Sequence, residues 1–271
     1  MNLPKVDADV FNSYGDDLTP EECYETLKTF KINKSPGNDG LTSEFYKKFW
    51  PLFGTMIVNS FNCSYQFGQL TSSQRQAVIT LIDKKKDRLL LKNWRPISLL
   101  NVDYKLLSKT LANRLTPILS TIIHPNQTGF MKGRNIGENI RILYDSIDFT
   151  KKNNKQGIIL ALDFEKAFDS LEWNFIIEVL KKFDFSKRFI KWIQLLYNDI
   201  SSCTINNGVS SGYFSVARGV RQGDPMSPYL FILAVEVLAQ MIRDDNKIKG
   251  LELPVGIVSL LLYADDVTGR D

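Results

Sequence analysis

Two short apolar runs that each end in aspartate constrain the fold of this chain most strongly. The later run covers residues 260–262 and leads through Tyr263 and Ala264 to the adjacent carboxylates Asp265 and Asp266. A carboxylate beside buried apolar residues is costly unless a cation or hydrogen bonds compensate its charge. Paired acidic residues at a strand end are therefore typical of a divalent cation site, and hard oxygen ligands suit Mg²⁺. Taken alone, such a pair after a strand is more often a solvated turn, and its weight comes from a second acidic strand end earlier in the chain.

The earlier run, residues 158–162, is also apolar and partly β-branched, and it stops at Asp163. Because it is short and follows Gly157, we expect a core strand here and not a helix. Two strands that each end at an aspartate can face each other across a hairpin. Asp163 and Asp265 would then share two metal ions about 3.5–4 Å apart, as in nucleotidyl transfer. Because successive strand residues point to opposite faces, Asp266 is given a supporting role.

Three segments in this order resemble the first, second and third palm motifs of reverse transcriptases. They are residues 163–169 (DFEKAFD), 221–228 (RQGDPMSP) and 263–266 (YADD). The pattern is similar to that of non-LTR (LINE-type) retrotransposons, and residues 35–40 (SPGNDG) and 95–99 (RPISL) resemble upstream blocks of the same family. Five blocks in order, from about Ser35 to Asp266, make this resemblance specific.

The resemblance implies an RNA-directed DNA polymerase domain with an α+β, right-hand polymerase fold. An antiparallel palm sheet packed on helices is expected. The resemblance also implies a division into a helical extension (residues 1–75), fingers (76–155) and an incomplete palm (156–271), with the thumb absent. RNA template, DNA primer and deoxynucleoside triphosphates are the implied partners, whereas the oligomeric state is left open.

For the chemistry, the resemblance implies that Asp163, Asp265 and Asp266 are catalytic and bind two Mg²⁺ ions, which Mn²⁺ could replace. The main-chain carbonyl of Phe164 is a further expected ligand. Phe168 is expected to lie under the sugar and to exclude a 2′ hydroxyl, although a buried core phenylalanine is the alternative from the residues alone. The other residues expected to bind substrate are Lys84, Arg95, Gln222, Gly223, Tyr263 and Ala264.

The basic residues of the expected fingers leave open which lysine contacts the triphosphate. Residues 77–82 and 95–100 are predicted to be strands, separated by a charged loop that contains Lys84, Lys85 and Lys86. Lysine offers a compact charge and arginine a bidentate fork to a triphosphate. A solvated loop is the alternative. Many relatives carry a proline directly before the lysine, and this chain does not, so any of the three lysines could make the contact.

Composition excludes several other classes of site. The net charge is +4, with Lys and Arg dispersed, which fits a polyanionic partner as well as an ordinary mixed surface. Three widely spaced Cys residues favour a reducing compartment and neither a zinc site nor a disulfide framework. His124 is the only His, and we expect a structural or surface role for it. Without a signal or transmembrane pattern, the chain is expected to be intracellular, in cytoplasm or nucleus.

Local signals predict several element ends. Thr19, Pro20 and Glu22 form a capping-box pattern at a helix start. The Trp50–Pro51 pair predicts a break or new start in the next helix. Asp103 and Asp169 are each expected to cap a helix, which assigns Asp169 to capping and not to a metal. The Asn207–Gly208 pair predicts a hairpin turn.

The end of the sequence departs from the family pattern. Residues 267–271 are short and polar. We therefore expect the return strand after Asp266 to be absent or stunted, leaving an unpaired sheet edge. The chain then reads as a fragment of a longer polyprotein. A catalytically inactive reverse-transcriptase fold that at most binds nucleic acid is the alternative function.

Overall fold

The computed structural model describes residues 3–6, 12–156, 158–253, 256–264 and 266–270. Its helices are η1 (Asn12–Gly15), α2 (Pro20–Lys28), α3 (Ser43–Phe67), α4 (Ser72–Arg75), η2 (Leu91–Asn93), α5 (Val102–Ile122), α6 (Ile136–Lys152), α7 (Ala167–Ser170), α8 (Trp173–Lys182), α9 (Lys187–Tyr197) and α10 (Ser227–Asp244). Its strands are β1 (Gln76–Asp83), β2 (Trp94–Leu100), β3 (Ile159–Asp163), β4 (Ser201–Asn206), β5 (Val209–Ser210), β6 (Phe214–Ser215), β7 (Leu251–Leu253), β8 (Gly256–Val258), β9 (Leu260–Tyr263) and β10 (Asp266–Arg270). The fold is mixed α/β.

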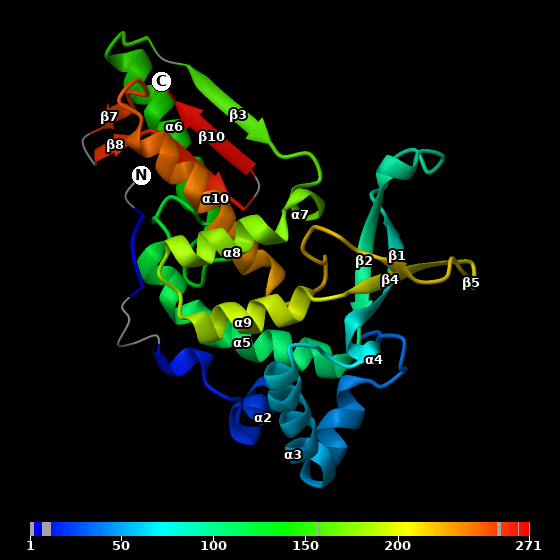
Figure 1. Cartoon of the computed structure of the whole chain (residues 1–271). Helices are drawn as coiled ribbons and strands as arrows, with labels where there is room; N and C mark the ends of the chain where they lie inside the picture. The colour runs from blue at the N-terminus through cyan, green and yellow to red at the C-terminus, as the bar shows by residue number, and fades with distance from the viewer. Residues whose placement is uncertain (1–2, 7–11, 157, 254–255, 265, 271) are drawn as a thin grey trace.

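Two separate sheets carry most of the strands. The larger has the order β2-β1-β4-β5, with β6 paired to β4, and it is mixed because β1 and β4 run parallel. The smaller sheet, β3-β10-β9, is antiparallel. Figure 1 shows the larger sheet on the right of the helices and β3 with β10 at the upper left. A short β7–β8 hairpin lies beside α6.

One apolar core unites the N-terminal helices with the middle of the chain. Fully buried members include Leu27 of α2, Phe61 of α3, Leu111 of α5 and Phe189 of α9. In Figure 1 these helices lie together in the lower half of the molecule. Residues before β1 thus pack against the helices that follow it, instead of forming a separate body. None of the described helices is both long and apolar enough to cross a membrane.

Several predicted element ends are confirmed. Thr19 and Glu22 make the capping box of α2, and Pro20 is its first residue. The α3 helix stops at Gly68, whose φ of 78° is the left-handed conformation that glycine adopts without strain. Asn207 and Gly208 both have positive φ in the tight turn between β4 and β5, as a two-residue hairpin turn requires.

The predicted break at Trp50–Pro51 is wrong, because α3 continues through the proline. Aromatic packing across the proline explains this. The ring of Phe53, after the proline, lies 5.5 Å from that of Phe45 and 6.5 Å from that of Phe49, both before it. These contacts hold the two halves in one helix and outweigh the hydrogen bond that proline removes.

The predicted cap of α5 is also wrong. Asn101, not Asp103, occupies the N-cap position, and Asp103 lies inside the first turn. The Asp103 carboxylate instead accepts a hydrogen bond from the Gln74 side chain at 2.9 Å. The helix then runs on past Pro117 because Leu119 and Ile122, beyond the proline, are buried in the main core.

Two expectations for the smaller sheet are corrected. β3 forms as predicted but is not a core strand: Ile158, just before it, and Leu160 are 69% and 55% exposed. It pairs with β10 at the side of the sheet, whereas α6 and α10 pack against β9. The return strand is present as β10, which pairs with both β9 and β3. Its residues gain backbone partners on both sides, and this compensates for their modest apolar content.

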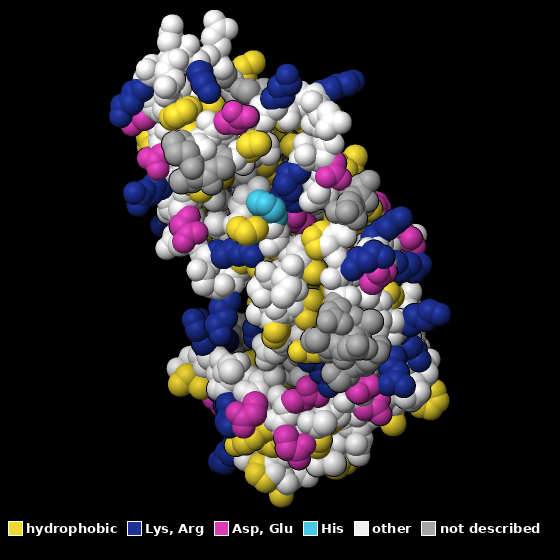
Figure 2. Space-filling view, turned by 90° about the vertical axis from the view of Figure 1, so that its left-hand side faces the viewer, with side chains coloured by type: hydrophobic (Ala, Val, Ile, Leu, Met, Phe, Trp, Pro, Cys, Tyr) yellow, Lys and Arg dark blue, Asp and Glu magenta, His cyan; other side chains and the backbone are white. Residues whose placement is uncertain are grey.

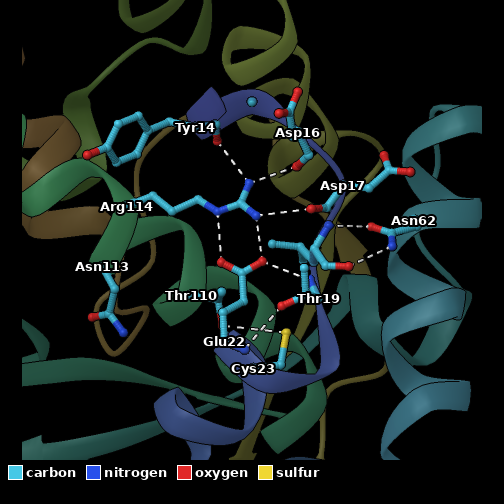
Figure 3. A network of polar contacts seen from close by, with 12 residues as sticks. Tyr14, Asp16, Asp17, Thr19, Glu22, Cys23, Asn62, Thr110, Asn113 and Arg114 are labelled. Carbon is cyan, nitrogen blue, oxygen red and sulfur yellow. Dashed lines mark hydrogen bonds and ion pairs between the residues drawn. The ribbon is translucent and has the colours of Figure 1, made fainter. Parts of the chain in front are cut away.

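Arg114 of α5 ties the segment before α2 to the core (Figure 3). Its guanidinium forms a bidentate pair with the carboxylate of Glu22, at 3.0 and 2.5 Å. The same group donates to the main-chain oxygens of Tyr14, Asp16 and Asp17, at 2.9, 2.7 and 3.1 Å. Because the Arg114 side chain is only 12% exposed, these charge-assisted bonds are shielded from water.

Replacing Arg114 should therefore destabilise the whole fold. Arg114→Met is expected to lower the free energy of unfolding by about 2–4 kcal/mol, because it leaves a half-buried carboxylate and three carbonyls without their hydrogen-bond donor. Arg188→Met is the matched control, since Arg188 pairs with Asp16 of the same segment but is 67% exposed. That change should cost at most about 1 kcal/mol. Equal losses in urea unfolding would contradict the anchoring role of Arg114.

Candidate functional site

Two of the three predicted acidic residues lie opposite each other where β3 and β10 pair. Asp163, the last residue of β3, is exposed and lies opposite Asp266, the first residue of β10. Asp266 pairs with Tyr263 of β9 on its other side. Asp265 lies outside the described residues. Among those described, no three carboxylate, Cys or His side chains gather into a cluster that could hold a metal.

The hairpin between Tyr263 and Asp266 is held from outside by a buried side chain. Ala264 has a φ of 54°, a left-handed conformation that is uncommon for residues other than glycine. The Gln127 carboxamide oxygen accepts from the Ala264 N–H at 2.9 Å, and its nitrogen donates to the Ala264 carbonyl at 3.4 Å. Gln127 is completely buried, and Ala264 is 4% exposed.

The connection between α5 and α6 runs alongside β9. A parallel bridge joins Gln127 to Leu262. The N–H of Thr128 donates to the Leu262 carbonyl at 3.0 Å, and the N–H of Leu262 donates to the Asn126 carbonyl at 3.0 Å. Buried Asn139 of α6 also donates to the Leu262 carbonyl, at 2.7 Å. Gln127 was not among the predicted site residues, because a buried amide side chain leaves no pattern in a sequence.

Two predicted aromatic residues contact the same ring of α10. Phe168 stacks on Phe231 with ring centroids 5.1 Å apart and planes 10° apart. Phe164 meets the edge of Phe231 at 6.4 Å. Both are half-buried beside Leu260 and Leu262 of β9. Phe168 is thus a packing residue that keeps part of its ring accessible.

The capping role assigned to Asp169 is wrong. Asp169 lies inside the short α7, and α8 begins at Trp173 after Glu172, which makes no side-chain capping bond. The intervening residue Leu171 instead accepts a hydrogen bond from the N–H of Gly219 at 2.8 Å. Pairing with that segment draws residues 171–172 away from the geometry of a capping box. Partial burial raises the pKa of the Asp169 carboxyl, and the positive charge of Lys166 acts in the opposite direction.

The segment from Gly219 to Gly223 links α7 to the larger sheet. The N–H of Val220 donates to the Phe168 carbonyl at 2.8 Å, and the Gln222 carbonyl accepts from the N–H of Ser98 in β2, also at 2.8 Å. Gly223 then passes so close to β2 that a Cβ there would lie 2.7 Å from the Ser98 oxygen. Two predicted substrate residues, Gln222 and Gly223, are thereby attached to the edge of β2.

Asp224 anchors that segment in the core. Its carboxylate is 3% exposed and accepts from the hydroxyls of Ser108 and, at 3.2 Å, Tyr104, and from the N–H of Met226 at 3.1 Å. Burial raises the pKa of this carboxyl, and the hydrogen bonds and nearby Arg221 act in the opposite direction. In the sequence, Asp224 is only one residue of the 221–228 motif, and nothing near it signals this anchoring role.

Lys84 and Arg95 lie together on the β1–β2 hairpin. Arg95 pairs with Ile82, and Lys84 follows two residues later on the same side of the strand. Both basic side chains are exposed. The N–H of Lys84 donates to the Asn93 carbonyl at 3.0 Å, so Lys84 continues the ladder, whereas Lys85 has a φ of 58° and turns away from it. This geometry favours Lys84 over Lys85 as the partner of Arg95.

The predicted residues thus form two groups. One comprises Asp163, Asp266, Tyr263 and Ala264 with the nearby Phe164 and Phe168; the other comprises Lys84, Arg95, Gln222 and Gly223. No direct contact between Asp163 and either basic side chain occurs within the described residues. The segment 219–223 connects the groups through its bonds to Phe168 and Ser98. Elsewhere on the surface, Lys and Arg are spread among Asp and Glu on the face shown in Figure 2.

Comparison with known proteins gives one family. The family described as "Reverse transcriptase (RNA-dependent DNA polymerase)" matches residues 82–268. "Transposon TX1 uncharacterized 149 kDa protein" from Xenopus laevis is 36% identical over 92% of this chain and 19% of its own length. "Retrovirus-related Pol polyprotein from type-2 retrotransposable element R2DM" from Drosophila melanogaster is 29% identical over 87% of this chain and 22% of its own. The chain therefore spans about a fifth of these relatives.

The close passage of Gly223 gives a testable consequence. Gly223→Ala should lower the free energy of unfolding by about 2–4 kcal/mol, because its φ of 113° and the nearby Ser98 oxygen both exclude a Cβ. Gly212→Ala is the control, since Gly212 also has a positive φ, 74°, but open space around its Cβ position. That change should cost about 1 kcal/mol. Thermal unfolding with equal losses would show that Gly223 does not press on β2.

Proposed function

Because this chain belongs to the reverse transcriptase family, we propose that it is an RNA-directed DNA polymerase domain that adds deoxynucleotides to a primer 3′ hydroxyl. Its similarity to retrotransposon proteins supports a retrotransposon as its source. The observation that carries the proposal is the pairing of Asp163 with Asp266, at the junction of two segments that the family motifs single out.

The residues present fit a divalent cation. Cross-strand partners have Cα atoms about 4.5–5.5 Å apart, so two carboxylates can serve one site. Asp163 is exposed, and no described side chain bonds its carboxylate, which leaves its oxygens free as hard ligands. When bound, divalent ions lower the pKa of the attacking hydroxyl and neutralise charge on the leaving group. We assign Asp163, Asp265, Asp266 and the Phe164 carbonyl to holding two Mg²⁺ ions, with Mn²⁺ as a substitute.

Lys84 and Arg95 are proposed to bind the triphosphate. Two exposed cations on one side of a hairpin match a chain of phosphates, and the Arg95 guanidinium can form two parallel bonds to one of them. Gln222 and Gly223, attached to the same strand, are proposed to contact nucleotide or primer through the backbone. In this scheme β1 and β2 belong to fingers (residues 76–155), the smaller sheet to a palm (156–271), and residues 1–75 form a helical extension.

Phe168 is proposed to select the sugar. Its stacking on Phe231 fixes the ring plane, and its half-buried state leaves an edge free for a nucleotide. A fixed ring excludes a 2′ hydroxyl by steric conflict, so deoxynucleotides are favoured through rejection of ribonucleotides. Tyr263 and Ala264 complete the proposed nucleotide and primer site from the acidic hairpin.

Removing the Asp163 carboxylate is the direct test. Asp163→Asn keeps the shape of the side chain and should reduce primer extension on an RNA template by more than about 100-fold, the upper range for groups that only support metal ligands. Stability should change by less than about 0.5 kcal/mol because Asp163 is exposed. Asp148→Asn, an exposed aspartate of α6, should extend as the unaltered chain does.

Full extension by Asp163→Asn would remove Asp163 from the chemistry. If the unaltered chain binds primer–template but extends it with neither Mg²⁺ nor Mn²⁺, the inactive reverse-transcriptase fold becomes the better description.

Sugar selection provides a separate test. Phe168→Val should lower the ratio of kcat/KM for deoxynucleotides to that for ribonucleotides by about 10-fold or more, because the smaller side chain admits the 2′ hydroxyl. Phe231→Leu is the comparison variant: it weakens the same packing but keeps the Phe168 ring, so it should lower the ratio less than Phe168→Val does. An unchanged ratio in Phe168→Val would make Phe168 only a core residue.

A further inference from the structure

The Gln127 side chain forms hydrogen bonds with both backbone groups of Ala264 in the acidic hairpin. Its carboxamide oxygen accepts from the N–H of Ala264 at 2.9 Å and from the N–H of Gly129 at 2.8 Å. Its nitrogen donates to the Ala264 carbonyl at 3.4 Å. Since two backbone N–H groups point at the same atom, that atom must be the oxygen, which settles the orientation of the amide.

Ala264 needs such an external hold. Tyr263 and Asp266 pair directly, so only Ala264 and the residue after it connect β9 to β10. Tight turns of this length require positive φ and usually contain glycine or asparagine. Ala264 adopts a φ of 54° without either advantage, and this conformation is strained for a residue with a Cβ. The bonds from Gln127 offset the strain at Ala264.

Glycine at position 129 allows the connection to approach the turn this closely. A Cβ on Gly129 would lie 2.2 Å from the Ala264 nitrogen and 2.8 Å from its Cα. Gln127 and Gly129 thus enclose Ala264 from the same side, and Ala264 is left 4% exposed.

We propose that Gln127 is a positioning residue for catalysis: it fixes the conformation of Ala264 and thereby sets where the backbone of Asp266 stands relative to Asp163. This inference rests on the proposed function, because it assigns Gln127 a part in the same reaction. Gln127 touches neither substrate nor metal in this scheme. Its effect reaches the site through the backbone, since β10 begins two residues after Ala264 and pairs with β3 at Asp163.

A positioning role predicts a loss in kcat and not in substrate affinity. A displacement of about 1 Å in a reacting group can cost as much as about 100-fold in rate. Gln127→Met keeps the length of the side chain and removes all three bonds. It should lower kcat for single-nucleotide addition by about 10- to 100-fold while KM for the nucleotide changes by less than about threefold.

Asn139→Leu is the comparison variant. Asn139 donates three hydrogen bonds in the same region, to Leu262, Thr128 and Asn126, but none to the turn itself. Its loss should destabilise the fold at least as much as Gln127→Met does. A merely structural role for Gln127 would make the two variants lose rate in parallel with stability, and that result would overturn the proposal.

Amide hydrogen exchange supplies a readout that does not depend on activity. The Ala264 N–H should exchange faster in Gln127→Met than in Asn139→Leu, because only Gln127 accepts its proton. If Gln127→Met does not fold, Gln127→Glu is the second variant: it retains both acceptor contacts but sets a carboxylate oxygen against the Ala264 carbonyl, and it should show a kcat loss of the same kind. Unchanged kcat and unchanged exchange in the folded variant contradict the proposal. An unaltered chain that fails to extend primers refutes the proposed function instead, and the exchange rates then decide alone whether Gln127 holds the turn.

Discussion

Hydrogen bonds from the α5–α6 connection to β9 are the interactions on which the acidic hairpin depends. At Leu262 the connection supplies both a donor and an acceptor to the strand, and at Ala264 the Gln127 side chain does the same. Buried backbone groups without such partners would each cost about 1–3 kcal/mol. The strand that leads to the acidic residues is thereby fixed by residues far away in the sequence. Asn139 reinforces the arrangement from α6.

A second polar anchor connects this region to the larger sheet. Asp224 is buried against Tyr104 and Ser108 of α5, and it holds the segment that bonds to Phe168 on one side and to β2 on the other. A buried carboxylate is tolerated here because several donors satisfy it. The same segment carries Gln222 and Gly223. The residues of this one motif therefore have two roles. Gln222 and Gly223 are proposed to contact substrate, whereas Asp224 anchors the segment in the core.

Sequence reasoning succeeded where short-range physics decides the outcome. The capping box at Thr19 depends on neighbouring residues alone, the β1–β2 pair joins strands close in the sequence, and the family motifs located the acidic strand ends. It failed where distant packing decides. Aromatic contacts carry α3 through Pro51, the exposure of β3 follows from its position in the sheet, and β10 forms because two partner strands are available to a polar sequence. The burial of Gln127 has no local signature at all.

The central claim is that β3 and β10 pair in the register that sets Asp163 opposite Asp266. Disulfide trapping measures this register directly, in a Cys63→Ser background that removes the exposed native thiol. The Asp163→Cys, Asp266→Cys pair should oxidise readily, because cross-strand Cα atoms lie within the distance of about 4.4–6.8 Å that a disulfide spans. Ala161→Cys with Asp266→Cys sets the comparison, as these diagonal positions lie about 7–8 Å apart. Preferential bonding of the diagonal pair, or of neither pair, would contradict the proposed acidic site.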